Sequence, residues 1–265
     1  MTNILFYLFG SETNEQSILE NMSYVMLLMG GVTFLILLFE NVPYGRYASK
    51  RYGFPVNVKF AWFVQEMPAL VVPLLLLLTT SAARASYLPN RLLIAMYLCH
   101  YLQRSLIYPF LIRGGKPTPF LSFASAFVFC VFNGYLQVRY LSHFAMYPAE
   151  WITQPCFILG FIMWLMGMLI NIHSDHILRN LRKPGETDYK IPKGGLFRYV
   201  SGANFLGEIM EWAGFAVASW SIQSASFAIF TLVVLSSRAV SHHRWYLEKF
   251  DDYPKSRTAL IPFLF

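Results

Sequence analysis

Charged residues are scarce in this chain: Asp, Glu, Lys and Arg together make up 13% of its 265 residues. A soluble domain usually carries about 25% charged residues. The hydrophobic share is 56% and the mean hydropathy is +0.45, which excludes an ordinary soluble protein and predicts a membrane protein. The formal net charge of +7 then belongs to the loops. It gives no argument for nucleic acid, and it suits anionic lipid headgroups or a phosphate-bearing ligand at the membrane face.

Cysteine is also scarce, and Cys99, Cys130 and Cys156 show no paired spacing. Each lies in or beside an apolar run, so we interpret them as packing residues and expect neither a disulfide framework nor a metal site. The sequence lacks a G-x-G-x-x-G motif after a strand, a P-loop and a serine-centred elbow. A soluble-type nucleotide fold is therefore excluded, and any cofactor must be held among helices. Because the N-terminus has no basic region, we expect no cleavable signal.

Long apolar runs predict an all-α fold with about seven transmembrane helices in a single domain, residues 1–265. Each run approaches the roughly 20 residues that a bilayer requires. The predicted spans are 20–40, 60–84, 91–112, 116–139, 151–174, 202–220 and the run from a tight turn at 221–224 to about 246. Residues 1–18 are expected to form a short, weakly anchored lead-in, and 176–201 a basic cytosolic loop. Pro68 and Pro73 are expected to kink the second helix.

Basic residues are concentrated in alternate loops, and the positive-inside rule converts this asymmetry into an orientation. With the N-terminus outside, the outer segments hold only Arg84, Arg91 and Arg139. The cytosolic segments hold Arg46, Lys50, Arg51, Lys59, Arg113, Lys116 and the basic loop. We therefore predict an outer N-terminus and a cytosolic C-terminus.

The stretch from residue 171 to 212 joins two polar stripes through the basic loop. Residues three, four or seven apart share a helix face. One stripe consists of Asn171, Asp175 and Arg182, and the other of Asn204, Glu208 and Glu211. A carboxylate in a membrane span is costly and is a functional-site hypothesis by default. The loop between the stripes holds Arg179, Arg182, Lys183, Lys190, Lys193 and Arg198.

Glu66 follows Gln65 in an apolar run that also contains Trp62, Phe63 and Met67. Desolvation favours the neutral carboxylic acid, which can donate a hydrogen bond or carry a proton. The alternative is an interfacial side chain that reaches water at the cytosolic end of the helix. We favour the functional interpretation because the other faces of the run are apolar.

A stripe of Tyr97, Tyr101, Arg104 and Tyr108 follows helical spacing on the third predicted span. A tyrosine hydroxyl donates a hydrogen bond without carrying charge, so such a stripe could polarise a carbonyl group. The spacing is equally compatible with a packing stripe whose arginine snorkels or pairs with a carboxylate such as Glu66.

Arg238, His242 and Tyr246 form a similar stripe on the last predicted span. Basic and aromatic groups at a cytosolic helix end suit the phosphates and base of a nucleotide. They equally suit lipid headgroups and a helix C-terminus, where cations are favoured. Spacing alone does not separate these interpretations.

Several motifs closely resemble the steroid 5α-reductase family (3-oxo-5α-steroid 4-dehydrogenases). They are NIHSDHILRNLRKPGE, IPKGGLF, YVSGANFLGEIMEW and YPKSRTALIPFLF. The variants WFVQEMP, HYLQRSLIYPFLIRGGKP and NGYLQVRYLSH are most similar to its type 1 branch. The resemblance covers residues 61–265. It implies a seven-helix membrane enzyme that uses NADPH to reduce the carbon 4–5 double bond of a 3-oxo-Δ4 steroid such as testosterone or progesterone.

The resemblance also implies roles for individual residues. Tyr101 and Glu66 match the pair that binds and polarises the 3-oxo group, with Gln65 beside them. The implied cofactor-binding set is Asn171, Asp175, Arg179, Arg182, Tyr189, Asn204, Glu208, Glu211, Trp212, Arg238, His242 and Tyr246. Lys116 and Lys190 stand where the family has other basic residues. A lysine keeps the charge but loses the bidentate fork of arginine.

Implied partners are a steroid that enters from the bilayer and the lipid membrane itself, with no metal and no nucleic acid. The oligomeric state stays open, and a monomer is compatible with the sequence. The expected location is the endoplasmic reticulum in a eukaryote or the inner membrane in a bacterium.

Related activities stay open as alternatives: a membrane reductase of a polyprenol or an enoyl thioester, or a membrane methyltransferase that binds S-adenosylmethionine. A retinal protein is disfavoured because the last predicted span has no lysine for a Schiff base. A transporter is disfavoured because no internal repeat is visible.

Overall fold

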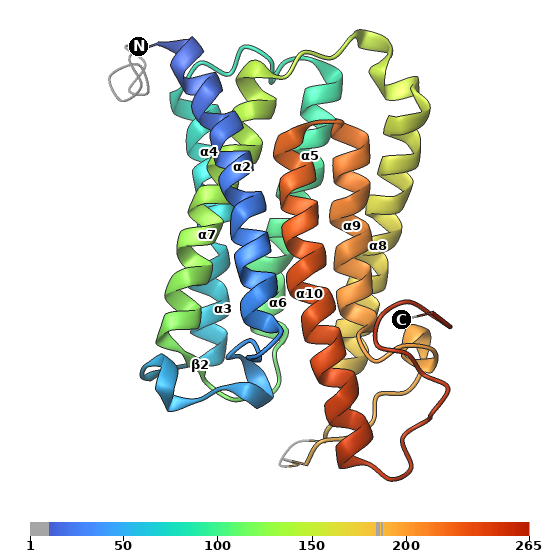
Figure 1. Cartoon of the computed structure of the whole chain (residues 1–265). Helices are drawn as coiled ribbons and strands as arrows, with labels where there is room; N and C mark the ends of the chain where they lie inside the picture. Colours follow the sequence, from blue (N-terminus) through green and yellow to red (C-terminus); the bar gives the residue numbers. More distant parts are fainter. Residues whose placement is uncertain (1–10, 184–185, 187, 265) are drawn as a thin grey trace.

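The described residues, 11–183, 186 and 188–264, form an antiparallel bundle of long helices in a computed structural model (Figure 1). Five helices are long and apolar enough to cross a membrane: Thr13–Leu37, Val58–Thr79, Phe120–Phe144, Pro155–Arg179 and Ile222–Lys249. This confirms the prediction of an all-α, polytopic membrane fold.

The elements follow one another in a simple order. The helices are α2 (Glu12–Leu37), α3 (Val58–Glu66), α4 (Pro68–Thr79), α5 (Leu88–Leu102), α6 (Tyr108–Leu111), α7 (Phe120–Arg139), α8 (Pro155–Arg179), α9 (Ala203–Ser219) and α10 (Ile222–Lys249). Two π-helical segments, η3 (Gln103–Ile107) and η4 (Tyr140–Phe144), follow α5 and α7. Short 3-10 turns are η1 (Gly45–Tyr47), η2 (Lys50–Tyr52), η5 (Ala149–Thr153) and η6 (Gly195–Arg198). Strands β1 (Pro55–Val56) and β2 (Thr118–Pro119) pair antiparallel.

Helical segments occupy all seven predicted spans, but two are too short or too polar to satisfy the same spanning criterion. These are α9, with 17 residues, and α5, with 15 residues before its π-helical continuation. The crossing of the membrane by all seven, and its direction, therefore stay predictions. Pro68 begins α4 directly after α3, and Pro73 lies inside α4. The predicted turn lies slightly earlier than 221–224: the chain reverses at Trp220 and Ser221, and α10 begins at Ile222, where the Ser221 side chain caps it by accepting from the Ser224 backbone N–H.

The prediction of a weakly anchored lead-in at residues 1–18 is wrong for its second half; residues 1–10 lie outside the described residues. Helix α2 begins at Glu12, and Glu15 is buried against α7. Its carboxylate accepts hydrogen bonds from Arg139 Nε at 2.6 Å and Nη2 at 2.7 Å, and from the Tyr135 hydroxyl at 2.7 Å. Glu15 and Arg139, which the predicted topology places in separate outer segments, thus form one buried pair.

Helices α8 and α9 touch backbone to backbone. A Cβ atom added at Gly167 would lie 2.3 Å from the Glu211 nitrogen, and one at Gly207 would lie 2.5 Å from the Asn171 nitrogen. Gly160 and Gly214 make the equivalent contacts two turns further along. Small residues permit such close approach between membrane helices. The seam brings the two polar stripes of the 171–212 stretch together.

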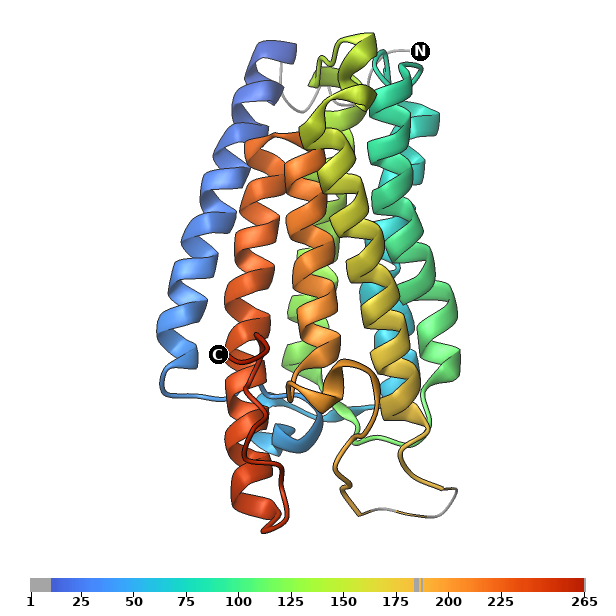
Figure 2. The same cartoon turned by 90° about the vertical axis from the view of Figure 1, so that its right-hand side faces the viewer.

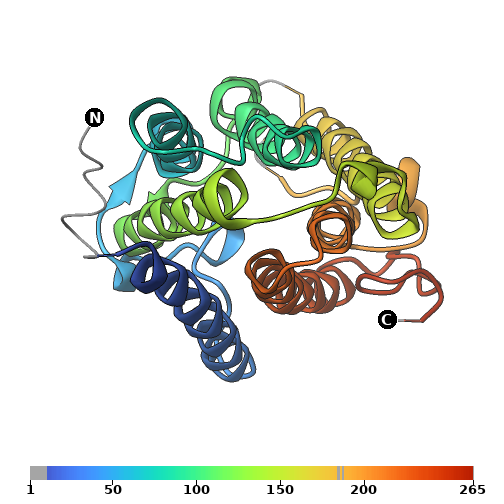
Figure 3. The same ribbon diagram turned by 90° about the horizontal axis from the view of Figure 1, so that it is seen from above.

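The loop after α2, the loop after α8 and the C-terminal end of α10 lie at the same end of the bundle, here called the basic end (Figures 1 and 2). The segment after α10 starts at this end, turns back along the bundle and lies at its edge beside α10 (Figures 2 and 3). Ser201 N–H donates to Thr258 O at 2.9 Å and Gly202 N–H donates to Ala259 O at 3.0 Å. Leu260 is buried beside α9 and α10. The C-terminal segment therefore holds the start of α9 in place.

Candidate functional site

Arg104 is the centre of a buried charged cluster between α5, α8 and α9. It is 7% exposed, and its Nη1 and Nη2 atoms lie 2.8 Å from Asp175 Oδ2 and 3.2 Å from Glu208 Oε2. Asn171 Nδ2 donates to the Asn204 backbone carbonyl at 2.9 Å and to Glu208 Oε2 at 3.4 Å. Asn171 and Asp175 of one predicted stripe therefore meet Glu208 of the other across the α8–α9 seam. Arg182 does not belong to the stripe, because α8 ends at Arg179. Arg104 pairs with carboxylates, as the packing interpretation expected, but its partners are Asp175 and Glu208 and not Glu66.

A π-helical bulge turns Arg104 toward this cluster. Pro109 follows the bulge and lacks the backbone N–H that would continue the α-helical ladder. The guanidinium carbon lies 4.6 Å from the ring centroid of Tyr108 and 5.1 Å from that of Trp62. Cation–π contacts and two carboxylates together stabilise a charge that burial alone would disfavour.

One turn from Arg104, His100 joins α5 to α9. Its Nδ1 atom lies 2.8 Å from Glu211 Oε1, and both side chains are buried. The Trp212 ring packs on His100 with centroids 4.5 Å apart and lies 5.9 Å from the Tyr101 ring. The predicted residues Glu211 and Trp212 thus lie beside Tyr101.

Tyr101 is 3% exposed, and its ring packs at a tilt against that of Tyr97 with a centroid distance of 4.7 Å, which confirms that the two phenols share a face. The amide of Asn133, from α7, donates to the Tyr101 hydroxyl at 3.3 Å and to the Tyr97 hydroxyl at 3.5 Å. The phenol stripe is therefore held by an amide from a different helix.

Glu66 projects from the last turn of α3 toward the same region. Gln65 Nε2 donates to one carboxyl oxygen at 3.3 Å, and the Cys130 thiol donates to the other at 3.7 Å. Cys130 and Asn133 are three residues apart on α7, so they lie on one face of that helix. Glu66 and Tyr101 therefore hydrogen-bond to adjacent positions of the same helix.

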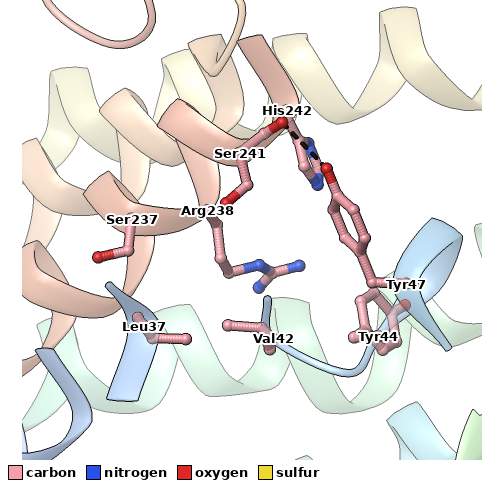
Figure 4. Close-up of a pocket in the computed structure, with 8 residues that line it drawn as sticks. All are labelled: Leu37, Val42, Tyr44, Tyr47, Ser237, Arg238, Ser241 and His242. Carbon is pink, nitrogen blue, oxygen red and sulfur yellow. Dashed lines mark hydrogen bonds between the residues drawn. The ribbon is translucent and has the colours of Figure 1, made fainter. Parts of the chain in front are cut away.

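Closer to the basic end, the Arg238 side chain extends from α10 toward the loop after α2 (Figure 4). Its guanidinium carbon lies 4.8 Å from the Phe205 ring centroid and 5.4 Å from that of Tyr44. The Tyr44 hydroxyl accepts from Trp62 Nε1, which links this region to the Arg104 cluster. Burial raises the pKa of the Tyr44 phenol, so its proton is retained.

The small pocket drawn in Figure 4 also includes His242 and Tyr47. The Tyr47 hydroxyl donates to the Ser241 backbone carbonyl at 3.0 Å. The His242 ring lies 6.1 Å from the Tyr47 ring and 5.4 Å from the Phe205 ring. The predicted residues Arg238 and His242 therefore line one cavity with aromatic side chains from the α2–α3 loop.

Arg46, from the same loop, lies inside an aromatic box at the end of α10. Its guanidinium carbon is 4.0 Å from the Trp245 ring centroid, 4.9 Å from that of Tyr246 and 5.1 Å from that of Tyr189. Nη2 donates to the Tyr246 hydroxyl at 3.4 Å, whereas Nη1 is buried without a hydrogen-bond partner among the described residues. Arg182 lies over the ring of Tyr189, with its guanidinium carbon 5.2 Å from the ring centroid.

An open hollow of about 670 Å³ lies beside the basic loop. Its polar and aromatic lining comprises His176, Asn180, Tyr189, Lys190, Lys193, Phe250 and Asp252. Arg179 lies at its edge, with Nη2 2.9 Å from His176 Nδ1. Arg179 therefore contacts a residue that lines this hollow.

The predicted residues form one polar column from Tyr101 to Tyr246, and the structure adds members that the sequence reasoning missed. The added residues are His100, Asn133, Trp62, Tyr44 and Arg46. For His100 and Asn133 a signal existed, since a polar side chain inside an apolar span is costly unless it has a partner. Arg46 and Tyr44 lie in a loop, where nothing in the spacing indicated a contact.

Comparisons with known proteins identify relatives of this chain. Residues 116–265 match the family model described as 3-oxo-5-alpha-steroid 4-dehydrogenase. The chain is 57% identical over 253 residues to 3-oxo-5-alpha-steroid 4-dehydrogenase 1 of Mus musculus, covering 96% of this chain and 99% of the relative. It is 55% identical over 251 residues to the Homo sapiens type 1 protein, covering 95% and 97%. Identity to the Sus scrofa type 2 protein is 50% over 229 residues, covering 85% and 89%.

The fold and the buried polar column define a polytopic helical membrane protein with a charged interior. The extent and level of the matches then identify its family. The chain belongs to the 3-oxo-5-alpha-steroid 4-dehydrogenase family, whose members are oxidoreductases.

Proposed function

We propose that this protein reduces the carbon 4–5 double bond of a 3-oxo-Δ4 steroid to the 5α product, with NADPH as reductant. The single observation that carries the proposal is the buried column that begins at Tyr101 and Glu66 and continues through Arg104 to Arg46. One end is apolar with two hydrogen-bonding groups, and the other is cationic and aromatic. That order matches an apolar ketone followed by an anionic nucleotide. The names of the relatives support the steroid as substrate.

The residues present fit a nicotinamide dinucleotide. Arg46 Nη1 is a buried donor without a described partner, which an anionic oxygen would satisfy. The rings of Tyr189 and Trp245 around it suit a base or a sugar-phosphate segment. Asn171 and the carboxylates of Asp175 and Glu208 offer an amide donor and acceptors toward a carboxamide and ribose hydroxyls. Arg182 and the basic loop would face the phosphates.

A bound NADPH would supply the hydride for carbon 5 of the enone. Reduction at that carbon places negative charge on the 3-oxo oxygen, and a proton taken up from solvent at carbon 4 then gives the saturated ketone. Tyr101 donates a hydrogen bond to this oxygen, and protonated Glu66 donates a second. Gln65 and Cys130 hold the Glu66 carboxyl group in place through their own hydrogen bonds.

Water exclusion strengthens these hydrogen bonds. Tyr101, Tyr97 and Trp212 are all at most 3% exposed. In a water-poor site a fixed donor stabilises developing charge more than it does in water, because no solvent competes for the oxygen. A steroid reaches such a site from lipid with little desolvation cost.

The test is turnover of testosterone and progesterone by the purified protein in detergent, with NADPH, and with products identified by mass and stereochemistry. We expect 5α-reduced 3-oxo steroids. Absence of turnover combined with an NADPH-induced rise in melting temperature would retain a reductase but discard the steroid, leaving a polyprenol or an enoyl thioester. Stabilisation by S-adenosylmethionine and not by NADPH would favour the methyltransferase instead.

A further inference from the structure

Asn133 is a fully buried amide in the middle of α7, outside the set of residues that the function so far requires. We propose that Asn133 is a positioning residue that makes the Tyr101 hydroxyl a one-directional donor, aimed at the substrate ketone. The inference rests on the proposed role of Tyr101 and deepens it.

The direction of the hydrogen bonds follows from a backbone carbonyl. The Gln223 carbonyl at the start of α10 can only accept, and Gln137 Nε2 donates to it at 2.7 Å. The same amide nitrogen donates to Asn133 Oδ1 at 3.2 Å. Because the oxygen side of Asn133 faces Gln137, its nitrogen side faces Tyr101 at 3.3 Å. The Gln223 carbonyl of α10 thus sets the donor direction of the hydrogen bonds that lead through Gln137 and Asn133 of α7 to Tyr101 of α5.

This polarity decides what Tyr101 can do with its own proton. A phenol oxygen that accepts from an amide N–H cannot donate to that amide. The proton of Tyr101 is then left for the hydroxyl of Tyr97, whose ring centroid lies 4.7 Å from that of Tyr101, or for a ketone oxygen. Asn133 Nδ2 also lies 3.5 Å from the Tyr97 oxygen, so Tyr97 already has a donor. A ketone oxygen that gains negative charge is the stronger acceptor, so the proton is directed to it.

Burial makes this orientation rigid. Asn133 is 0% exposed and Gln137 is 1% exposed. A flipped Asn133 amide would bring its nitrogen against Gln137 Nε2, and a flipped Gln137 amide would bring its oxygen against the Gln223 carbonyl oxygen. Each unsatisfied buried group is costly. A fixed donor direction needs no reorganisation when charge develops on the substrate.

A double-mutant cycle between Asn133→Leu and Tyr101→Phe tests the proposal. Leu keeps the approximate volume but removes the donor. We expect Asn133→Leu to lower kcat by about tenfold to hundredfold, as for loss of one hydrogen bond to developing charge. The KM for steroid and the affinity for NADPH should change little. In the Tyr101→Phe background, Asn133→Leu should lower kcat no further, because the hydroxyl on which it acts is gone.

A spectroscopic readout separates positioning from structure. The carbonyl stretch of a steroid labelled with carbon-13 at position 3, bound together with NADP⁺, reports the strength of the hydrogen bond to the ketone. Both Asn133→Leu and Tyr101→Phe should shift this stretch to higher frequency. If Asn133→Leu does not fold, Gln137→Leu releases the Asn133 amide without touching Tyr101 and should shift the stretch in the same direction.

The outcomes separate failure of the inference from failure of the proposed function. If Tyr101→Phe retains full turnover, the proposed role of Tyr101 fails and the role of Asn133 fails with it. If Tyr101→Phe loses turnover but the two substitutions are additive and the stretch is unmoved by Asn133→Leu, then only the inference is overturned, and Asn133 is a packing residue.

Discussion

At the scale of single residues, Arg104 shows how a charge is kept inside this protein. It is bound by Asp175 and Glu208 and covered by the ring of Tyr108. Removing one partner of a buried pair typically costs about 3–5 kcal/mol, because the other charge is left uncompensated. The cluster therefore fixes the relative positions of α5, α8 and α9 at the level of the proposed nicotinamide site.

Glu66 gives the most direct residue-scale prediction. Glu66→Gln retains a neutral donor, whereas Glu66→Ala removes it. We expect Gln to keep measurable turnover and Ala to lose a further tenfold to hundredfold in kcat (roughly 1.4–2.7 kcal/mol), because one donor to the developing oxyanion is removed.

Steady-state turnover of testosterone with saturating NADPH provides the measurement. The matched control is Glu40→Gln, because Glu40 lies in an exposed ion pair with Arg51. Equal activity of Glu66→Gln and Glu66→Ala would remove the hydrogen-bonding role from Glu66.

Helical spacing predicted some site residues well because both partners lie on long helices. Asn171, Asp175 and Glu208 were placed on facing stripes, and the structure brings them together. The identity of the carboxylates that pair with Arg104 was not predictable, since the π-helical bulge changes the helical register after Gln103. Arg46 was also beyond reach, because it comes from a loop that is 200 positions from Tyr246 along the chain.

At the scale of elements, the glycine seam between α8 and α9 sets the geometry of the site. Gly167 faces the Glu211 backbone and Gly207 faces the Asn171 backbone. Any side chain at either position must push the helices apart. The hydrogen bond between Asn171 and the Asn204 carbonyl, at 2.9 Å, depends on this close approach.

We expect Gly167→Ala to lower the free energy of unfolding by about 1–3 kcal/mol through overpacking, and to weaken NADPH binding because the two polar stripes separate. Melting temperature in detergent, with and without NADPH, measures both effects. Gly31→Ala in α2 is the matched control, since an added Cβ there meets nothing within 4 Å. It should be neutral or slightly stabilising, because alanine favours a helix over glycine by roughly 0.5–1 kcal/mol. If the Gly167→Ala protein has the same melting temperature as the Gly31→Ala protein, the close contact between α8 and α9 is contradicted.

At the scale of the whole molecule, the Glu15–Arg139 pair ties α2 to the rest of the bundle. Arg139 is 0% exposed and also donates to the Ser81 backbone carbonyl at 2.6 Å. We expect Glu15→Gln to destabilise the protein by about 3–5 kcal/mol, because a buried guanidinium loses its counter-charge.

The measurement is thermal unfolding in detergent, with Glu20→Gln, an exposed residue of the same helix, as the control. Combining Glu15→Leu with Arg139→Leu should recover much of the loss, since a buried pair replaced by apolar groups is often nearly neutral. Unfolding of Glu15→Gln at the temperature of the control would show that the pair contributes no stability.

The orientation of the bundle is a second prediction at this scale. The predicted cytosolic side carries most of the basic loops, so Lys255 should be cytosolic and Glu150 external. Cysteine introduced at either exposed position can be labelled with an impermeant maleimide in sealed vesicles of known sidedness, with the unmodified chain as control. We expect the label at position 150 from the external side and at position 255 only from the cytosolic side. The reverse pattern would invert the topology.

The bond between the segment after α10 and the start of α9 has a consequence for synthesis. Thr258 and Ala259 hold Ser201 and Gly202 through backbone hydrogen bonds. During translation, residues 258 and 259 leave the ribosome after every described helix has been made. A nascent chain can therefore insert its whole bundle while the junction between the basic loop and α9 is still unfastened. A stop codon placed just after α10 would leave all membrane helices in place, but the start of α9 would lack its backbone hydrogen bonds to Thr258 and Ala259.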